Sequence, residues 1–412
     1  MDGRPPAGSW SVAELTDELV RRHPGVVGRR ADVRVVRAPG RVNLIGEYTD
    51  FNDGFVLPAA IDLEIRIAYV PVRDRRVTLT RLDDGATDAF DLDRERAPTG
   101  SFLDYVAGTA WALAGLGHRP SGLVGVIATS LPPGAGLSSS AAIESSAAWA
   151  MLDDRAPDID ALDLARICQR AENGYVGVRS GLMDQFASAC GVAGHALLLD
   201  CRSQAWTAVP LPPDIALVVC HTGAPRQLDG SAYNERRAQC EAAVAAVAAI
   251  DPTVRSLRDV TPDHLAATGD RLDPIARRRA EHVITENERV HQVVGALPRD
   301  DLSTIREAFA DSHASLRDRF DVVTPELDAM VSIAMSTPGV IAARMTGAGF
   351  GGCTINLVHP DAVDALREAV ETRYAVTTGL RPMILRVEAA AGAGRLDGEH
   401  APADTPGTRA AR

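Results

Sequence analysis

The stretch "LPPGAGLSSSAAIESSAAWA", Leu131 to Ala150, decides the fold of this chain, because it runs from a glycine turn straight into a helical pattern. Gly134 and Gly136 let the backbone turn tightly and approach a ligand with no Cβ in the way. Serines at the start of the apolar pattern are typical N-cap and first-turn residues, which predicts a helix from Ser139. The stretch is therefore either a phosphate-binding helix N-terminus or a serine-capped helix after an ordinary turn.

No lysine follows the turn, although the best-known phosphate loop, G-x-x-x-x-G-K-[ST], ends in one. The whole sequence contains no lysine, so all 43 basic residues are arginine. A lysine phosphate clamp, a lysine Schiff base and a lysine general base are therefore excluded. Backbone amides, the helix dipole and a serine-bound Mg²⁺ ion remain as the groups that can neutralise phosphates.

Composition indicates an ordinary globular protein. The chain has 412 residues, 46% hydrophobic and 24% charged, which suits two domains or one large two-lobed domain. The net charge of −12 argues against a nucleic-acid partner or an acidic membrane. The sequence has neither a secretory signal nor a membrane-spanning run, and its six cysteines form no C-x-x-C pair, so we expect a cytoplasmic protein with reduced thiols.

The order of predicted elements is mixed, which favours an α+β fold over a doubly wound sheet. Prolines interrupt the pattern at 209–214, and long Ala/Arg/Glu-rich helices then run to about residue 336. The predicted strands are 33–36, 61–70, 124–128, 196–199, 215–220, 340–345 and 353–358, with helices at 139–152 and 162–175. The predicted organisation is a disordered segment 1–10, an N-terminal domain 11–205, a C-terminal domain 206–391 and a disordered tail 392–412.

Two further stretches carry candidate site residues. "APGRVNLIGEYTDFNDGFVLPAAID", 38–62, places Arg41, Glu47 and Asp50 among turn formers. This grouping suits a polyhydroxylated ligand, with a solvated loop as the alternative. "CQRAENGYVGVRSGLMDQFASACG", 168–191, places Glu172 near a helix end and Asp184 in an apolar setting. Such an aspartate is either structural or able to act as a base or orient a hydroxyl.

The stretch "MTGAGFGGCTINLV", Met345 to Val358, contains G-x-G-x-x-G. A strand follows this loop where the dinucleotide fingerprint requires a helix, so the Rossmann interpretation is excluded. A glycine loop between two strands allows close backbone approach to a ligand or to a neighbouring domain.

Together, these four stretches resemble the GHMP small-molecule kinases, and within them the galactokinases. "GRVNLIGEYTDFNDGFVLP" resembles the galactokinase signature, "LPPGAGLSSSAA" the phosphate loop and "MTGAGFGGCTINLV" the third motif. The resemblance runs from about Arg37 to Val358 in the family's order. It implies transfer of the γ-phosphoryl group of ATP, with Mg²⁺, to the anomeric hydroxyl of α-D-galactose, giving galactose 1-phosphate.

The resemblance also implies a two-lobed fold with the active site in the cleft between the lobes. The N-terminal domain would be ribosomal-protein-S5-like and the C-terminal domain ferredoxin-like. Asp184 would act as base or orienting carboxylate and Arg41 would stabilise the transferring group, while Ser140 and Glu172 would bind Mg²⁺. The implied sugar-binding residues are Glu47, Tyr48, Thr49, Asp50, Gly181 and Tyr233, and the implied ATP-binding residues are Gly134, Ala135, Gly136, Leu137, Ser138, Ser139 and Ser140.

Three positions depart from the family pattern. Tyr48 stands where the signature has His, Phe51 where Tyr is usual, and Ser180 where Cys is common. Because Tyr48 falls in the sugar-contacting run, we expect a site that is permissive at one end of the sugar. The alternatives are a kinase for N-acetylgalactosamine, galacturonate or arabinose, and a non-catalytic sugar-sensing paralogue. The expected partners are a small sugar and ATP, and the expected assembly is a monomer or weak dimer.

Overall fold

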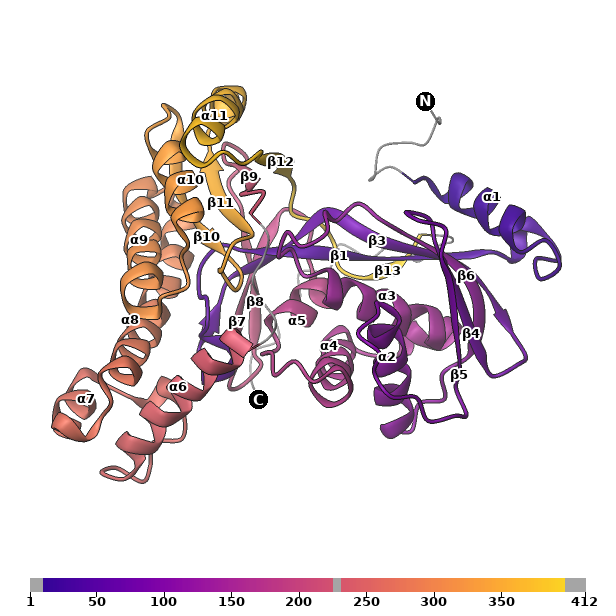
Figure 1. Cartoon of the computed structure of the whole chain (residues 1–412), viewed down its shortest axis with the longest axis horizontal. Coiled ribbons are helices and arrows are strands. Elements are labelled where there is room, and N and C mark those ends of the chain that lie inside the picture. Colours follow the sequence, from indigo (N-terminus) through magenta and orange to yellow (C-terminus); the bar gives the residue numbers. More distant parts are fainter. Residues whose placement is uncertain (1–9, 225–230, 397–412) are drawn as a thin grey trace.

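The computed structural model of the chain describes residues 10–224 and 231–396. Helices and sheets alternate irregularly along the chain, so the predicted α+β class is confirmed (Figure 1). Within these ranges the strands form three separate sheets, of six, four and three strands. No helix within the described ranges is both long and apolar enough to cross a bilayer. The predicted disordered segment 1–10 lies outside these ranges except for Trp10.

The six-stranded sheet forms the centre of the N-terminal half. Its order is β13-β1-β3-β6-β4-β5, and every neighbouring pair is antiparallel except β6 and β4. The strands are β1 (Arg34–Asn43), β3 (Pro58–Val72), β4 (Arg76–Arg81), β5 (Thr87–Asp91), β6 (Gly122–Thr129) and β13 (Gly394–Arg395).

Helices cover both faces of this sheet. Successive strand residues point to opposite sides, so each strand contributes apolar side chains to both faces. Val36 and Ile67 belong to the large core shared with α2 to α5, whereas their neighbours Val35 and Ala68 pack with α1. These helices are α1 (Val12–Arg22), α2 (Leu103–Gly115), α3 (Ser139–Leu152), α4 (Ala161–Ala171) and α5 (Met183–Cys190). The predicted helix 139–152 is thus confirmed, and the predicted helix 162–175 is α4 followed by a π-helical turn over Glu172–Val176.

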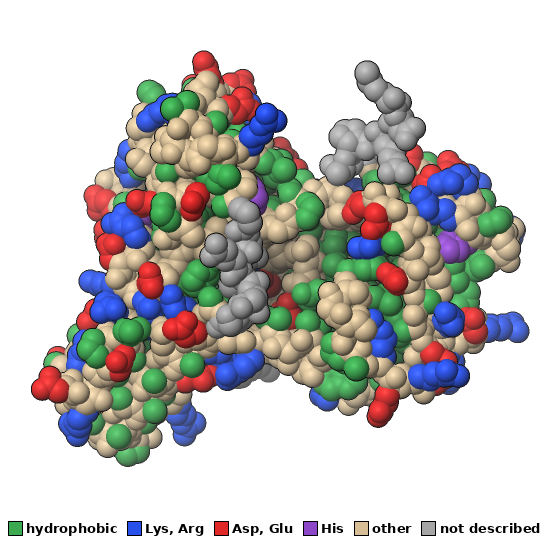
Figure 2. Space-filling view, viewed as in Figure 1, with side chains coloured by type: hydrophobic (Ala, Val, Ile, Leu, Met, Phe, Trp, Pro, Cys, Tyr) green, Lys and Arg blue, Asp and Glu red, His purple; other side chains and the backbone are tan. Residues whose placement is uncertain are grey.

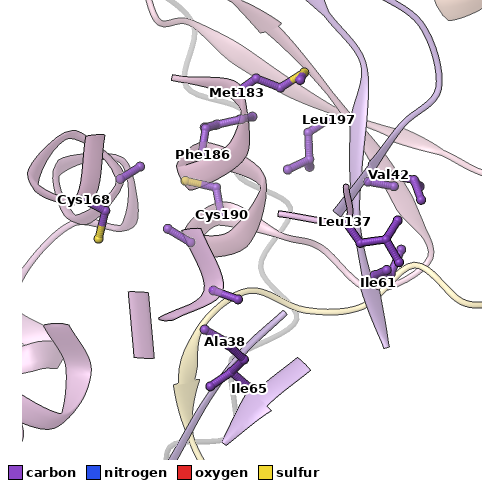
Figure 3. Packing of buried hydrophobic residues seen from close by; sticks show 14 of the residues in the cluster. Ala38, Val42, Ile61, Ile65, Leu137, Cys168, Met183, Phe186, Cys190 and Leu197 are labelled. Carbon is purple, nitrogen blue, oxygen red and sulfur yellow. The ribbon is translucent and has the colours of Figure 1, made fainter. Parts of the chain in front are cut away.

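Helix α5 is short, so its packing fixes its orientation. Met183, Phe186 and Cys190 lie on one helical face and are buried in the large core, near Leu197 (Figure 3). Asp184 lies one position further round the helix and keeps a 26% exposed side chain. The apolar face therefore anchors α5 and leaves Asp184 at the surface of the core.

The other two sheets are entirely antiparallel. The three-stranded sheet has the order β2-β7-β8, and the four-stranded sheet has the order β10-β11-β9-β12. Their strands are β2 (Phe55–Val56), β7 (His195–Asp200), β8 (Trp206–Pro210), β9 (Ala216–His221), β10 (Val340–Thr346), β11 (Cys353–Val358) and β12 (Met383–Val387). The accompanying helices are α6 (Ser231–Ala248), α7 (Pro262–Thr268), α8 (Pro274–Ala296), α9 (Leu302–Ser315), α10 (Pro325–Met335), α11 (Val363–Ala369) and α12 (Ala375–Thr378).

The chain changes sheets at the predicted proline break. The predicted boundary at residue 205 falls between β7 and β8, which pair with each other. The passage from the three-stranded to the four-stranded sheet lies between Pro210 and Ala216, where the prolines stand. Because a hairpin buries its two strands as one unit, pairing extends the N-terminal half beyond the predicted boundary.

The predicted disordered tail from residue 392 is wrong at its start. Gly394 pairs with Arg37 and Arg395 with Val36, so β13 adds an edge strand to the six-stranded sheet. Arg37 also donates to the carbonyls of Ala391 and Gly392. The chain after the C-terminal sheet therefore returns to the N-terminal half, and residues 397–412 lie outside the described part.

Candidate active site

The surface is hollowed between the half that carries α6 to α11 and the half that carries the six-stranded sheet (Figure 2). A cavity of about 350 Å³ is lined by residues from both halves, since Tyr233, Gly347 and Ala348 join loops from the N-terminal half. The predicted site residues in this lining are Arg41, Glu47, Tyr48, Asp50, Gly134, Gly136, Leu137, Ser138, Ser139, Ser140, Glu172, Gly181, Asp184 and Tyr233.

Two donors hold the Asp184 carboxylate. Arg41 places Nε 2.7 Å and Nη2 2.6 Å from Oδ1, and the Ser138 hydroxyl donates to Oδ2 at 2.6 Å. Arg41 also donates from Nη1 to the Gly136 carbonyl at 2.7 Å. Hydrogen bonds to charged groups are the strong ones, so Asp184 is fixed in orientation. Its partial exposure leaves it accessible to a ligand in the cavity.

The phosphate loop adopts the turn that its glycines predict. Gly134 and Gly136 have φ of +70° and +74°, a region that favours glycine. Ser138 stands at the N-cap of α3 with φ of 59°, but its hydroxyl makes no capping bond. Ser138 therefore takes the N-cap position that the sequence indicates, but its hydroxyl is bonded to Asp184 and does not cap the helix. Since Ser139 and Ser140 line the cavity, the N-terminus of α3 opens onto it.

The glycine loop after β10 approaches the phosphate loop closely. Gly347 has φ of +79°, and a Cβ on it would lie 3.3 Å from the Gly136 carbonyl oxygen. The sequence left open whether this loop approaches a ligand or the neighbouring domain. The structure shows that it closely approaches the other half of the molecule.

Glu172 lies 6% exposed at the end of α4 and faces several donors. The Ser180 hydroxyl donates to its Oε2, and Gln185 donates from Nε2 to the same oxygen at 2.8 Å. Ser140 lines the same cavity, and its side chain acts to lower the pKa of Glu172. Burial raises the pKa of Glu172, and the hydrogen bond from Ser180 opposes this rise. A cation beside Glu172 would favour its charged form.

The donor set suits a magnesium ion that arrives with phosphates. In the described part of the chain no three or more His, Cys, Asp or Glu side chains gather as a metal site. Mg²⁺ usually takes one or two carboxylates and completes its shell with substrate phosphates and water. Glu172 and the Ser140 hydroxyl, side by side at a helix N-terminus, fit that requirement.

Asp50 and Gly181 are in direct contact. A Cβ on Gly181 would lie only 1.9 Å from Oδ2 of Asp50, so no larger residue fits there without moving the carboxylate. Burial raises the pKa of Asp50 to about 6, and the nearby charge of Asp184 adds to this. Asp50 is therefore a partly buried carboxylate beside Asp184.

Glu47 is tied to the C-terminal half. Its Oε2 forms an ion pair with Nη2 of Arg344, and its Oε1 accepts from the Gly347 N–H at 3.0 Å. Arg344 is fully buried and also donates to the Leu44 carbonyl at 2.8 Å. Burial raises the pKa of Glu47, and the charge of Arg344 opposes this. Glu47 thus holds its loop against β10 as well as lining the cavity.

An aromatic cluster surrounds Tyr48, and two of its members, Tyr48 and Tyr233, form an aromatic wall of the cavity. The ring of Tyr48 lies with centroids 4.4 Å from Phe320, 5.6 Å from Tyr233 and 6.2 Å from Phe51. Its hydroxyl donates to the Ala348 carbonyl at 2.5 Å. The Tyr48 hydroxyl therefore reaches the glycine loop.

Two predicted residues are not brought into the cavity lining. Thr49 is fully buried, and its hydroxyl lies 2.7 Å from the Gly46 carbonyl and 2.6 Å from the Phe55 carbonyl. The Thr49 hydroxyl therefore bonds within its own loop, and the expectation that Thr49 binds the sugar stays a prediction. Ala135, within the phosphate loop, is 2% exposed and is not among the residues that line the cavity.

Comparison with known proteins agrees with this geometry. Family models match the galactokinase galactose-binding signature at residues 22–71, the GHMP kinases N terminal domain at 104–192 and the GHMP kinases C terminal domain at 293–376. A curated galactokinase from Roseiflexus sp. (strain RS-1) is 44% identical over 381 residues, covering 92% of this chain and 97% of the relative. The chain belongs to the galactokinase family. A galactokinase from Chloroflexus aurantiacus is 41% identical over 85% of this chain and 91% of its own length.

Solved structures extend the galactokinase likeness to the fold. The crystal structure of Lactococcus lactis galactokinase complexed with galactose matches with a TM-score of 0.88 and 34% identity, over 93% of this chain and 100% of that one. The Methanococcus jannaschii mevalonate kinase, at 16% identity and a TM-score of 0.62, shows the fold alone. The predicted two-lobed GHMP kinase fold is therefore confirmed.

The three departures from the galactokinase pattern lie together at the site. Tyr48 and Ser180 line the cavity, and Phe51 packs against Tyr48 and Tyr233. Ser180 donates its hydroxyl to Glu172, a bond that a cysteine thiol makes only weakly. The substitution at Ser180 therefore bears on the candidate metal ligand, and the other two bear on the aromatic wall.

Reasoning from the sequence missed three polar residues at the site. Glu144 and Gln185 are fully buried beside Glu172, and Arg344 is fully buried behind Glu47. Glu144 is the one charged residue in helix α3, and this feature of the sequence could have pointed to it. Gln185 follows Asp184 directly, but nothing in the sequence near Arg344 points to Glu47.

Proposed function

We propose that this protein transfers the γ-phosphoryl group of ATP to the anomeric hydroxyl of α-D-galactose, giving galactose 1-phosphate and ADP. The observation that carries the proposal is the position of Asp184, which is bonded to Arg41 and Ser138. Around it, residues of the stretch 38–62, here called the sugar loop, and of the phosphate loop line one cavity. The galactokinase relatives support galactose as the sugar.

Asp184 and Arg41 would act on the reacting atoms. Asp184 orients the anomeric hydroxyl, whose oxygen attacks the γ-phosphorus as the bond to the β-phosphate oxygen breaks. The hydroxyl proton passes to Asp184 or to the transferred group. Arg41 contacts both Asp184 and the Gly136 carbonyl, so it can stabilise charge on the equatorial oxygens. Phosphoryl transfer depends mainly on such positioning and positive charge.

The sugar pocket would be formed by the carboxylates and the aromatic wall. Asp50 can accept from two hydroxyls, and Gly181 leaves room for it. Both oxygens of Glu47 already have protein partners, so Glu47 has little remaining capacity to accept hydrogen bonds from the sugar. Tyr48 and Tyr233 would bound the sugar on the other side. Buried polar groups left unpaired by a wrong epimer make such a site selective.

Mg²⁺ would be held by Ser140 and Glu172 together with the phosphates of ATP. The ion supplies positive charge to the phosphates that lysine supplies in other phosphate loops. The residues Gly134 to Ser140 would supply backbone N–H groups at the start of α3.

A coupled ADP-release assay with galactose, glucose, 2-deoxygalactose, N-acetylgalactosamine, galacturonate and arabinose tests the proposal. We expect galactose to have the highest kcat/KM and the product to show an anomeric phosphate by ³¹P NMR. A roughly tenfold preference for another sugar, about 1.4 kcal/mol of transition-state binding, would overturn the assignment to galactose. ATP turnover with none of these sugars would favour the sensing paralogue.

A further inference from the structure

We infer that Gln185 is a positioning residue that holds Glu172 in place for the metal ion, and so links the Asp184 helix to the candidate Mg²⁺ site. The inference rests on the proposed function for the identity of the metal-nucleotide. It concerns a residue that touches neither the sugar nor the phosphates.

The geometry of the Gln185 amide is specific. Its Nε2 donates to Glu172 Oε2 at 2.8 Å and to Glu144 Oε2 at 3.1 Å. An amide nitrogen carries two N–H groups and each carboxyl oxygen accepts, so both bonds form at once in only one amide orientation. Gln185 and Glu144 are fully buried and Glu172 is 6% exposed. The bridge therefore lies behind the cavity wall, shielded from water.

The bridge restricts the Glu172 carboxylate. Its Oε2 receives both the Gln185 N–H and the Ser180 hydroxyl, from α5 and from the turn before it. With one oxygen fixed by two donors, the rotation of the carboxylate about its last bond is limited. Partners behind a metal ligand orient it, and their removal typically costs about 10- to 100-fold in metal affinity or activity.

The same residue joins two parts of the chemistry. Asp184 precedes Gln185 on α5 and faces Arg41, whereas Gln185 faces α3 and α4. A shift of α5 would therefore move the sugar-facing carboxylate and the metal ligand together. This arrangement assigns Gln185 to positioning, because its own side chain does not line the cavity.

The test is Gln185→Met, which keeps the length of the side chain and removes both donors. We expect the Mg²⁺ concentration for half-maximal rate to rise about tenfold, with kcat at saturating Mg²⁺ and the KM for galactose changing less than about threefold. Direct titration of Mn²⁺ in the presence of ADP, followed by electron paramagnetic resonance, should show the same loss of affinity without turnover.

Two further variants separate positioning from folding. Gln185→Met leaves Glu144 without a donor, so the double variant Gln185→Met with Glu144→Leu should regain thermal stability while Mn²⁺ binding stays weak. Gln239→Met is the matched control, since Gln239 also donates from Nε2 to a carboxylate, Glu235, at 2.8 Å outside the cavity lining. It should leave the metal affinity unchanged.

The outcomes are distinct. If the double variant recovers both stability and Mn²⁺ affinity, Gln185 is structural and the inference is wrong. The inference is also wrong if Gln185→Met turns over galactose with a wild-type Mg²⁺ dependence, and the proposed function then stands. If the wild type phosphorylates no sugar but its Mn²⁺·ADP affinity still depends on Gln185, the proposed function fails and the inference stands.

Discussion

Substituting Gly181 with alanine should displace Asp50 and selectively impair sugar binding. A Cβ on Gly181 would lie 1.9 Å from Oδ2, 2.2 Å from Cγ and 2.8 Å from Cβ of Asp50, and real Cβ contacts essentially never fall below 3.0 Å. The oxygen must therefore retreat by about 1.1 Å, which stretches a hydrogen bond of about 2.7 Å beyond its useful length. Because Asp50 Cβ is also too close, rotation of the side chain alone does not relieve the contact.

The size of the effect follows from the bond that is lost. A hydrogen bond to a charged group contributes about 1.5–3 kcal/mol, which corresponds to a loss of about tenfold to 150-fold in kcat/KM for galactose. The KM for ATP should stay within about twofold, because the phosphate loop is untouched. Steady-state kinetics with each substrate varied, together with calorimetric titration of galactose, measure this.

The control for Gly181→Ala is Gly25→Ala, where a Cβ meets no atom within 4 Å and φ is not positive. We expect this control to bind galactose like the wild type. A folded Gly181→Ala protein whose galactose affinity equals that of the control would refute the assignment of Asp50 to the sugar.

Four further results are expected. Asp184→Asn should keep galactose binding by calorimetry but lose most turnover, because an amide keeps the shape without the charge; near-normal turnover would remove Asp184 from catalysis. Ser140→Ala should raise the Mg²⁺ concentration for half-maximal rate, and an unchanged Mg²⁺ dependence would leave Ser140 as a structural residue. Since the pKa of Asp50 is raised to about 6, kcat/KM for galactose should fall as pH drops below about 6. The value of kcat should fall only at a lower pH, because the hydroxyls of bound sugar favour the charged carboxylate. If kcat and kcat/KM fall at the same pH, Asp50 does not bind the sugar. Tyr48→Phe should lower the free energy of unfolding by about 0.5–1.5 kcal/mol through loss of the bond to Ala348 without reordering the sugars; an altered ranking would show that the hydroxyl meets the sugar.

Local patterns predicted the elements that carry the site, whereas elements defined by long-range contacts were missed. Helix α3 begins at Ser139 as its serines and spacing indicate, and β11 matches its predicted range. Helix α2 is buried on most sides, so it shows no polar stripe that would mark it as a helix. Strand β13 is the dipeptide Gly394–Arg395, and it exists only because β1 offers an edge. No local propensity specifies such a strand.

The same limit applies to the site residues. The family motifs placed Asp184, Arg41, Ser138 and Asp50 in one cavity, as the structure confirms. The sequence placed Ser138 at a helix start but gave no partner for its hydroxyl, which bonds to Asp184, 46 positions away. Contacts across the two halves, such as Glu47 with Arg344, depend on the packing of β10 against the sugar loop. The spacing of residues along the sequence does not reveal which residues this packing brings opposite each other.

The charges around the cavity indicate why a chain without lysine is suited to phosphates. Of the described residues lining the cavity, Arg41 is the one basic side chain, against four carboxylates. Asp184 is paired with Arg41 and Glu47 with Arg344. Asp50 and Glu172 form no ion pair within residues 10–224 and 231–396, and burial raises the pKa of both.

A bound ligand that donates hydrogen bonds or carries positive charge would therefore stabilise the charged form of each of these two carboxylates. Asp50 sits beside Gly181 on the sugar loop side, where hydroxyl donors can supply that stabilisation. Glu172 faces Ser140 at the start of α3, where a divalent cation can do so. The phosphates would then be neutralised by Arg41, by the helix N-terminus and by an ion that Glu172 attracts. A lysine in the phosphate loop would compete with that ion for Glu172, so its absence is consistent with the buried acid behind the loop.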